Sequence, residues 1–98
     1  MQQIILLQKA DGYWDIGSDL AQALHVPEKN FKAEKPSSCS DSAWATFVVI
    51  YVLETKFDEL KDEWNLLVMK AKSWLQQQNV NTEECKAAAM KLIKLVKI

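Results

Sequence analysis

The sequence has few of the residues that interrupt helices. Its 98 residues include two glycines and two prolines, and there is little of the strict alternation that predicts strands. All four of these residues fall between segments of helical periodicity, where they mark turns; they are Gly12, Gly17, Pro27 and Pro36. We therefore expect an all-α fold.

The sequence also lacks an excess of charge of either sign. It has 12 basic and 13 acidic residues, a net charge of −1, so no overall field attracts phosphate backbones or anionic lipid. The longest apolar run, FVVIYVL at 47–53, is far below the roughly 20 residues that cross a bilayer. The apolar run at residues 4–7 is too short for the hydrophobic core of a signal peptide. These absences predict a cytoplasmic protein that binds neither nucleic acid nor membrane.

Cysteine and histidine are too scarce and too scattered for a metal centre. Cys39 lies in the Ser-rich stretch PSSCSDS and Cys85 in the first turn of a predicted helix, with no Cys-x-x-Cys pair. We expect no metal site and a pair of reduced thiols; a disulfide between them is the alternative.

Residues that would build a catalytic site are missing as well. The one histidine, His25, falls at a predicted helix C-terminus, where an imidazole interacts favourably with the helix dipole. No Gly-rich phosphate-binding loop is present. The main acidic cluster crowds one helix start, which favours solvation over acid–base chemistry; it comprises Asp58, Glu59, Asp62 and Glu63. We expect no catalytic residue, no cofactor and no enzyme activity.

Large apolar side chains are abundant. Hydrophobic residues make up 49% of the chain and include four tryptophans, which supply the dense core that so small a domain needs. We expect residues 1–98 to form a single helical domain, a compact orthogonal or irregular bundle of five to six helices. Two or three short helices come first and three longer ones follow; the predicted ranges are 2–9, 19–25, 27–34, 43–55, 58–77 and 83–97.

Individual helices have recognisable patterns. The helix over 43–55 is apolar on all sides, which predicts that it lies in the centre of the bundle. Ser18, and either Asp41 or Ser42, are expected as N-caps, and Pro27 as the first residue of its helix. The helix over 58–77 has a well-defined inner stripe, formed by Leu60, Trp64, Leu67, Ala71 and Trp74.

The stretch LLQKADGYWDI predicts a structural corner. Gly12 allows a positive φ at the end of the first helix, and the short side chain of Asp11 can bond to nearby amides. Gln8 can satisfy backbone groups there, and Trp14 would fold back over the first helix to close the core.

One surface feature of the 58–77 helix predicts a contact with a partner. Leu66 and Met69 point roughly opposite to the inner stripe, in company with Asp62 and Ser73. An exposed Leu–Met pair is a candidate binding spot, because Met adapts to different partner surfaces. The alternative is that the short N-terminal helices cover it.

Three segments follow, in the same order and with the same spacing, the pattern of a known family. They are LQKADGYWDIGSDLAQAL, SAWATFVVIYVLE and DEWNLLVMKAKSWL. They resemble the C-terminal domain of the von Willebrand factor A domain-containing 5A proteins. They are also similar to the vault-interaction region of vault poly(ADP-ribose) polymerase, although this chain lacks the longer insertions expected there between the last helices. The resemblance reaches Leu7, Gln8, Asp11, Gly12, Trp14, Leu20, Trp44, Glu63, Trp64 and Trp74.

The resemblance implies a C-terminal part of a longer protein, and we expect the domain to be a monomer. It implies docking onto major vault protein, the shell protein of the vault ribonucleoprotein particle. The alternative is a structural appendage that packs against another domain of its own parent chain. A small-ligand pocket between the Trp-lined helices is a third hypothesis.

Overall fold

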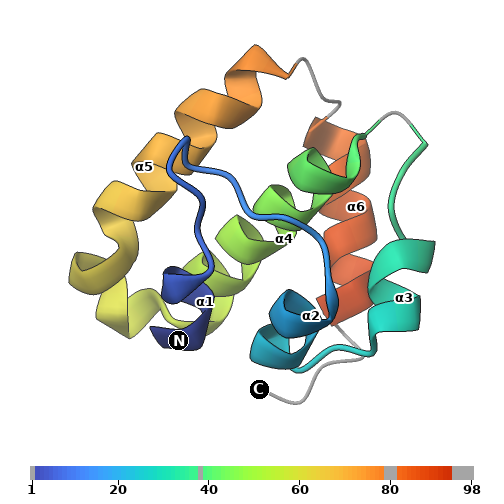
Figure 1. The fold of residues 1–98 in the computed structure, drawn as a ribbon, viewed down its shortest axis with the longest axis horizontal. Coiled ribbons are helices and arrows are strands. Elements are labelled where there is room, and N and C mark those ends of the chain that lie inside the picture. The colour runs from blue at the N-terminus through green and yellow to red at the C-terminus, as the bar shows by residue number, and fades with distance from the viewer. Residues whose placement is uncertain (1, 38, 79–81, 94–98) are drawn as a thin grey trace.

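The computed structural model describes residues 2–37, 39–78 and 82–93, which form six α-helices and no strand. Three short helices come first, α1 (Gln2–Leu6), α2 (Ser18–Leu24) and α3 (Glu28–Ala33). Three longer ones follow, α4 (Asp41–Lys56), α5 (Lys61–Gln77) and α6 (Thr82–Ile93). The predicted all-α bundle is confirmed (Figure 1).

Helix α4 forms the centre of the bundle. Both α5 and α6 pack against it, while α1, α2 and α3 form a chain of contacting short helices across the front (Figure 1). The apolar residues of α4 point in every direction and are nearly all removed from water, as the sequence predicts. The buried ones are Ala43, Trp44, Ala45, Val48, Val49, Ile50, Val52 and Leu53.

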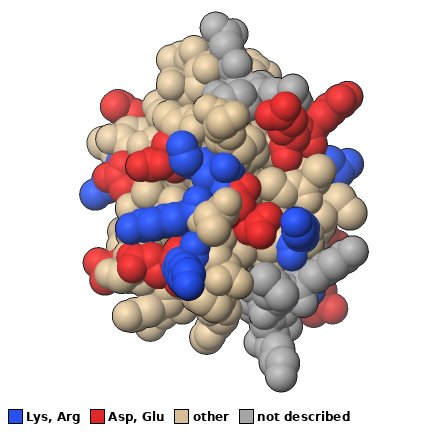
Figure 2. Space-filling model, turned by 90° about the vertical axis from the view of Figure 1, so that its right-hand side faces the viewer, with Lys and Arg blue, Asp and Glu red and all other residues tan. Residues whose placement is uncertain are grey.

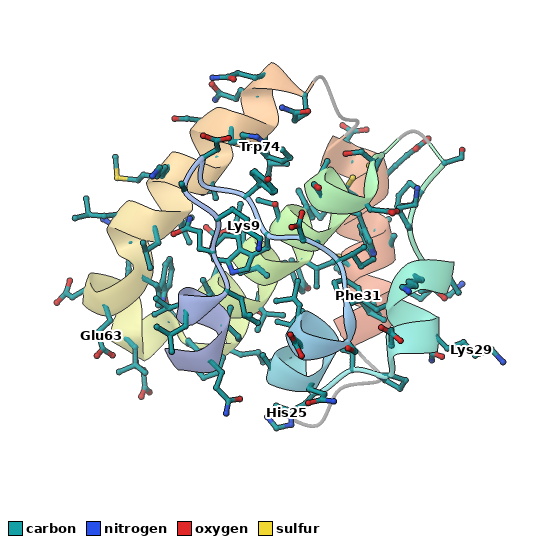
Figure 3. The ribbon with its side chains drawn as sticks, viewed as in Figure 1. Lys9, His25, Lys29, Phe31, Glu63 and Trp74 are labelled. Carbon is teal, nitrogen blue, oxygen red and sulfur yellow. The ribbon has the colours of Figure 1, made fainter. Side chains whose placement is uncertain are left out.

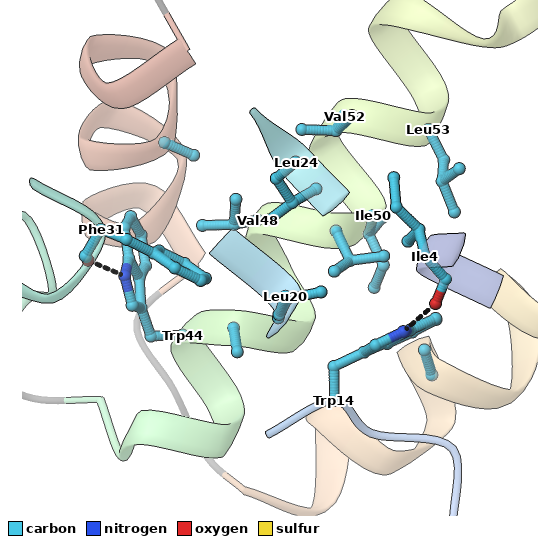
Figure 4. Packing of buried hydrophobic residues seen from close by; sticks show 14 of the residues in the cluster. Ile4, Trp14, Leu20, Leu24, Phe31, Trp44, Val48, Ile50, Val52 and Leu53 are labelled. Carbon is cyan, nitrogen blue, oxygen red and sulfur yellow. Dashed lines mark hydrogen bonds between the residues drawn. The ribbon is translucent and has the colours of Figure 1, made fainter. Parts of the chain in front are cut away.

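Each buried indole has a hydrogen-bond acceptor for its Nε1–H group. Trp14 Nε1 donates to the carbonyl oxygen of Ile4 (2.8 Å), and Trp44 Nε1 donates to that of Phe31 (2.7 Å), as Figure 4 shows. Trp64 Nε1 donates to the carbonyl oxygen of Phe57 (2.7 Å). Each ring therefore contributes its apolar area without leaving an unpaired donor in the core.

The ends of the short helices differ from the prediction. Helix α1 ends at Leu6 rather than at residue 9. Helix α2 begins at Ser18 itself, with Gly17 at the N-cap and no side-chain bond, so the prediction of Ser18 as the cap is wrong. At its other end His25 adopts φ 59°, and its backbone N–H, rather than the imidazole, bonds to the last turn.

Two further helix starts differ by one or two residues. Pro27 is the N-cap of α3 rather than its first residue. Ser40, and neither Asp41 nor Ser42, caps α4. Ser40 has the extended backbone that an N-cap requires, and its Oγ accepts a hydrogen bond from the Ala43 N–H (3.2 Å).

Helix α5 starts later than predicted. A 3₁₀ turn, Asp58–Leu60, precedes it, and Leu60 is 42% exposed instead of belonging to the inner stripe. The tighter turn rotates Leu60 out of the register of the following α-helix. Trp64 and Ala71 are buried as predicted, whereas Leu67 and Trp74 are only partly buried.

Helix α6 packs against α4, with Cys85, Ala89 and Leu92 buried. The remainder of the predicted 83–97 helix, from residue 94 onward, lies outside the described residues.

Candidate functional site

Gln8 joins the N-terminal segment to α5. Its Nε2 donates to the carbonyl oxygens of Gly12 (3.0 Å) and Leu67 (3.2 Å), the second of which lies 59 residues away in the sequence. Gln8 therefore donates to backbone groups of the corner and of α5. The corner also anchors the loop onto the helix that carries the candidate binding spot.

Gly12 allows the loop to approach α5 closely. Its φ is +108°, and a Cβ built there would lie 2.9 Å from Lys70 Cγ and 3.1 Å from the Lys70 carbonyl oxygen. The Gly12 N–H donates to the Lys9 carbonyl oxygen (2.9 Å), so the positive φ belongs to a tight turn after α1 rather than to the end of the helix. Both the backbone angle and the contact require glycine.

Trp14 closes the core beside α1, as predicted. In addition to its indole bond to Ile4, its backbone N–H donates to Thr46 Oγ1 (2.9 Å), and that hydroxyl donates to the Ser42 carbonyl oxygen (2.7 Å). Thr46 is not among the residues predicted for this corner. Its signal in the sequence is a single polar residue within an otherwise apolar stretch of α4.

Asp11 has a different role from the one predicted. Its side chain is exposed and makes no hydrogen bond within the described residues. The Gly12 N–H next to it bonds instead to the Lys9 carbonyl oxygen. The Asp11 side chain lies at a solvent-open hollow of about 420 Å³. The hollow is lined by Asp11, Lys70, Ser73, Trp74 and Gln77.

The Trp74 ring forms part of this hollow and supports the loop. Tyr13 stacks on it, with ring centroids 4.9 Å apart and an interplanar angle of 25°. Figure 3 shows Trp74 where the N-terminal loop passes α5. Nothing in the local sequence around Tyr13 indicates this partner, which comes from the packing of the loop on α5.

The outer face of α5, formed by Asp62, Leu66, Met69 and Ser73, is open to solvent. All four side chains are exposed, Leu66 to 77% and Met69 to 58%. Spaced by four, three and four residues, they lie along one side of the helix. The alternative that the short N-terminal helices cover this spot is wrong, because both apolar side chains are exposed.

This face differs from the rest of the described surface in its apolar content. The other large exposed hydrophobic side chains are Leu6, Leu60 and Met90, each on a different element. On the side of the molecule that carries α3 and α6, positive and negative side chains are interspersed (Figure 2). The Leu66–Met69 pair, with Ser73 beside the hollow, is the strongest candidate for recognition.

Among the described residues, metal-ligating side chains form no comparable cluster. The hollow contains one carboxylate, and no three His, Cys, Asp or Glu side chains of the described residues are grouped to hold a metal ion. No helix in the described part of the chain has the length and apolar character needed to cross a membrane.

The chain is homologous to a segment of von Willebrand factor A domain-containing protein 5A. It is 42% identical to the mouse protein over 74 residues and 37% identical to the human protein over 75 residues, which is 74% and 76% of this chain. It is 31% identical over 80 residues, 78% of this chain, to a von Willebrand factor A domain-containing protein of Dictyostelium discoideum. The matches span 8–10% of these relatives' lengths. No family model and no solved structure matches the chain.

Proposed function

From this homology we propose that the chain is a non-catalytic protein-interaction domain of a longer polypeptide. We propose further that it docks that polypeptide onto the vault particle in the cytoplasm by binding major vault protein. The homology to von Willebrand factor A domain-containing proteins supports an interaction role. The sequence resemblance to a vault-interaction region is the argument for the particular partner. The observation that carries the proposal is the uncovered Leu66–Met69 pair on α5.

The outer face of α5 has the composition of a small contact surface. Leu66 and Met69 supply apolar area at its centre, and Asp62 and Ser73 supply hydrogen-bonding groups at its ends. The unbranched Met side chain adapts its shape to a partner. The hollow beside Ser73, with Trp74 in its wall, would accept a side chain from the partner.

Binding to isolated major vault protein tests the proposal directly. The purified 98-residue chain should bind that protein and co-sediment with purified vaults. Leu66→Asp or Met69→Asp should each weaken binding at least about tenfold, because a charge would be buried against the partner. Both side chains are exposed in the free domain, so the melting temperature should change by no more than about 3 °C.

A matched control is Met90→Asp, which places the same charge on a 43% exposed apolar residue of α6. This variant should bind as the unmutated chain does. Full binding by both α5 variants would overturn the choice of surface. Failure of the unmutated chain to bind major vault protein would overturn the choice of partner.

One observation favours a second candidate function, packing against another domain of the same parent chain. The matched segment is at most 10% of the human relative, so most of such a protein lies outside this chain. If the outer face of α5 packs within the parent, limited proteolysis of the full-length protein should leave this domain associated with the remainder. Leu66→Asp should then release it. A docking domain should be released as a folded piece without any mutation.

A further inference from the structure

Two cysteines far apart in the sequence are in direct contact inside the fold. Cys39 Sγ and Cys85 Sγ are 2.7 Å apart, although the two positions are separated by 46 in the sequence, and both side chains are buried. A disulfide has an S–S distance of about 2.05 Å, so closing the remaining gap takes a movement of about 0.7 Å. The two buried thiols are therefore within reach of forming a disulfide.

The backbone on each side holds the two sulfurs together. Cys39 lies in the segment between α3 and α4, where its N–H donates to the Pro36 carbonyl oxygen (3.1 Å). Lys35 Nζ donates to the Cys39 carbonyl oxygen (2.9 Å). Cys85 lies in the first turn of α6, the helix that buries Ala89 and Leu92 against the core. Packing of α6 therefore determines whether the sulfurs meet.

We propose that Cys39 and Cys85 form a reversible disulfide that fastens α6 to the segment preceding α4, with a low-molecular-weight disulfide as the oxidant. One protein thiolate attacks the small disulfide, forms a mixed disulfide and releases one small thiolate, which takes up the proton lost by the protein. The second cysteine then attacks the protein sulfur of that mixed disulfide and releases the second small thiol. Two protein thiols are oxidised and one external disulfide is reduced to two thiols.

A disulfide fits this pair better than a metal ion does. Two thiolates alone do not complete a tetrahedral zinc site, and the described residues place no third His, Cys, Asp or Glu ligand in a group with them. The proposal is independent of the docking function, since neither cysteine belongs to the outer face of α5.

Burial makes the exchange depend on opening of the fold. Desolvation, followed by the hydrogen bond to Cys39, raises the pKa of the Cys85 thiol to about 12. The thiolate that attacks a disulfide is therefore scarce at neutral pH in the closed structure. Oxidation should follow transient opening of the first turn of α6, and the disulfide, once formed and buried again, should be reduced slowly for the same reason.

Incubation of the reduced chain in a series of glutathione and glutathione disulfide ratios tests the proposal. After alkylation of remaining thiols, mass spectrometry should show both cysteines disappearing together, with loss of two hydrogen atoms and no glutathione adduct. Peptide mapping should recover Cys39 linked to Cys85. The oxidised chain should melt about 10 °C or more above the reduced chain, because the cross-link constrains the unfolded state.

Cys39→Ala and Cys85→Ala are the matched controls, since each leaves one thiol and removes the intramolecular product. Neither variant should show a rise in melting temperature on oxidation. The mass and mapping measurements on the unmutated chain do not depend on whether these variants fold. A persistent glutathione adduct, a disulfide between two copies of the chain, or two free thiols at the most oxidising ratio would overturn the proposal.

Discussion

At the scale of single residues, the two glycines give a direct test of the N-terminal corner. In Gly12→Ala, the new methyl group would meet the Lys70 side chain and carbonyl at a positive φ. The unfolding free energy should fall by about 1–3 kcal/mol. Urea denaturation followed by circular dichroism measures the change.

Gly17 provides the matched control for this prediction. Its φ of 176° is ordinary extended backbone, and a Cβ there would meet nothing within 4 Å. Gly17→Ala should therefore leave stability unchanged or raise it by up to about 1 kcal/mol. Equal losses in the two variants would contradict the close approach of Gly12 to α5.

The tryptophans show how far residue type alone predicts position. Trp14, Trp44 and Trp64 are buried, as expected for the largest apolar side chains in a small domain. Trp74 is only half-buried, although the helical pattern places it in the same inner stripe as Trp64. Its ring is covered on one side by Tyr13 and open on the other, an arrangement created by the N-terminal loop.

At the scale of elements, the start of α4 depends on one hydroxyl group. Ser40 Oγ accepts the Ala43 N–H, one of the amides that have no partner within the helix. Ser40→Ala should lower the unfolding free energy by about 1 kcal/mol, measured by chemical denaturation. Ser42→Ala should cost less, because the Ser42 hydroxyl makes only an exposed bond of 3.3 Å to Asp15. A larger loss at Ser42 than at Ser40 would contradict the assignment of the cap.

Helix boundaries were the least predictable part of the elements. The sequence offers three neighbouring residues, Ser40, Asp41 and Ser42, that all have side chains suited to capping. The structure selects Ser40 because burial of Trp44 and Ala43 sets where the first turn of α4 must begin. Leu60 illustrates the same effect at α5, where a 3₁₀ turn moves it out of the predicted stripe.

At the scale of the whole molecule, a single core predicts a single unfolding transition. The buried cluster includes residues from Ile4 in α1 to Leu92 in α6. Tryptophan fluorescence and far-ultraviolet circular dichroism should therefore report the same midpoint in urea. A fluorescence change at lower urea concentration would show that the N-terminal corner, with Trp14 and the Tyr13–Trp74 stack, unfolds separately.

The amino-acid sequence alone was enough to establish the helical class, the central place of α4 and the outward direction of Leu66 and Met69. The distribution of apolar residues around each helix carries that information, since it indicates whether one side or every side of the helix is removed from water.

Three other features came only from the folded chain: the bond from Gln8 to Leu67, the fit of Gly12 against Lys70, and the contact between Cys39 and Cys85. Each joins residues far apart in the sequence. Their meeting depends on how the helices pack together, and no local pattern encodes that packing.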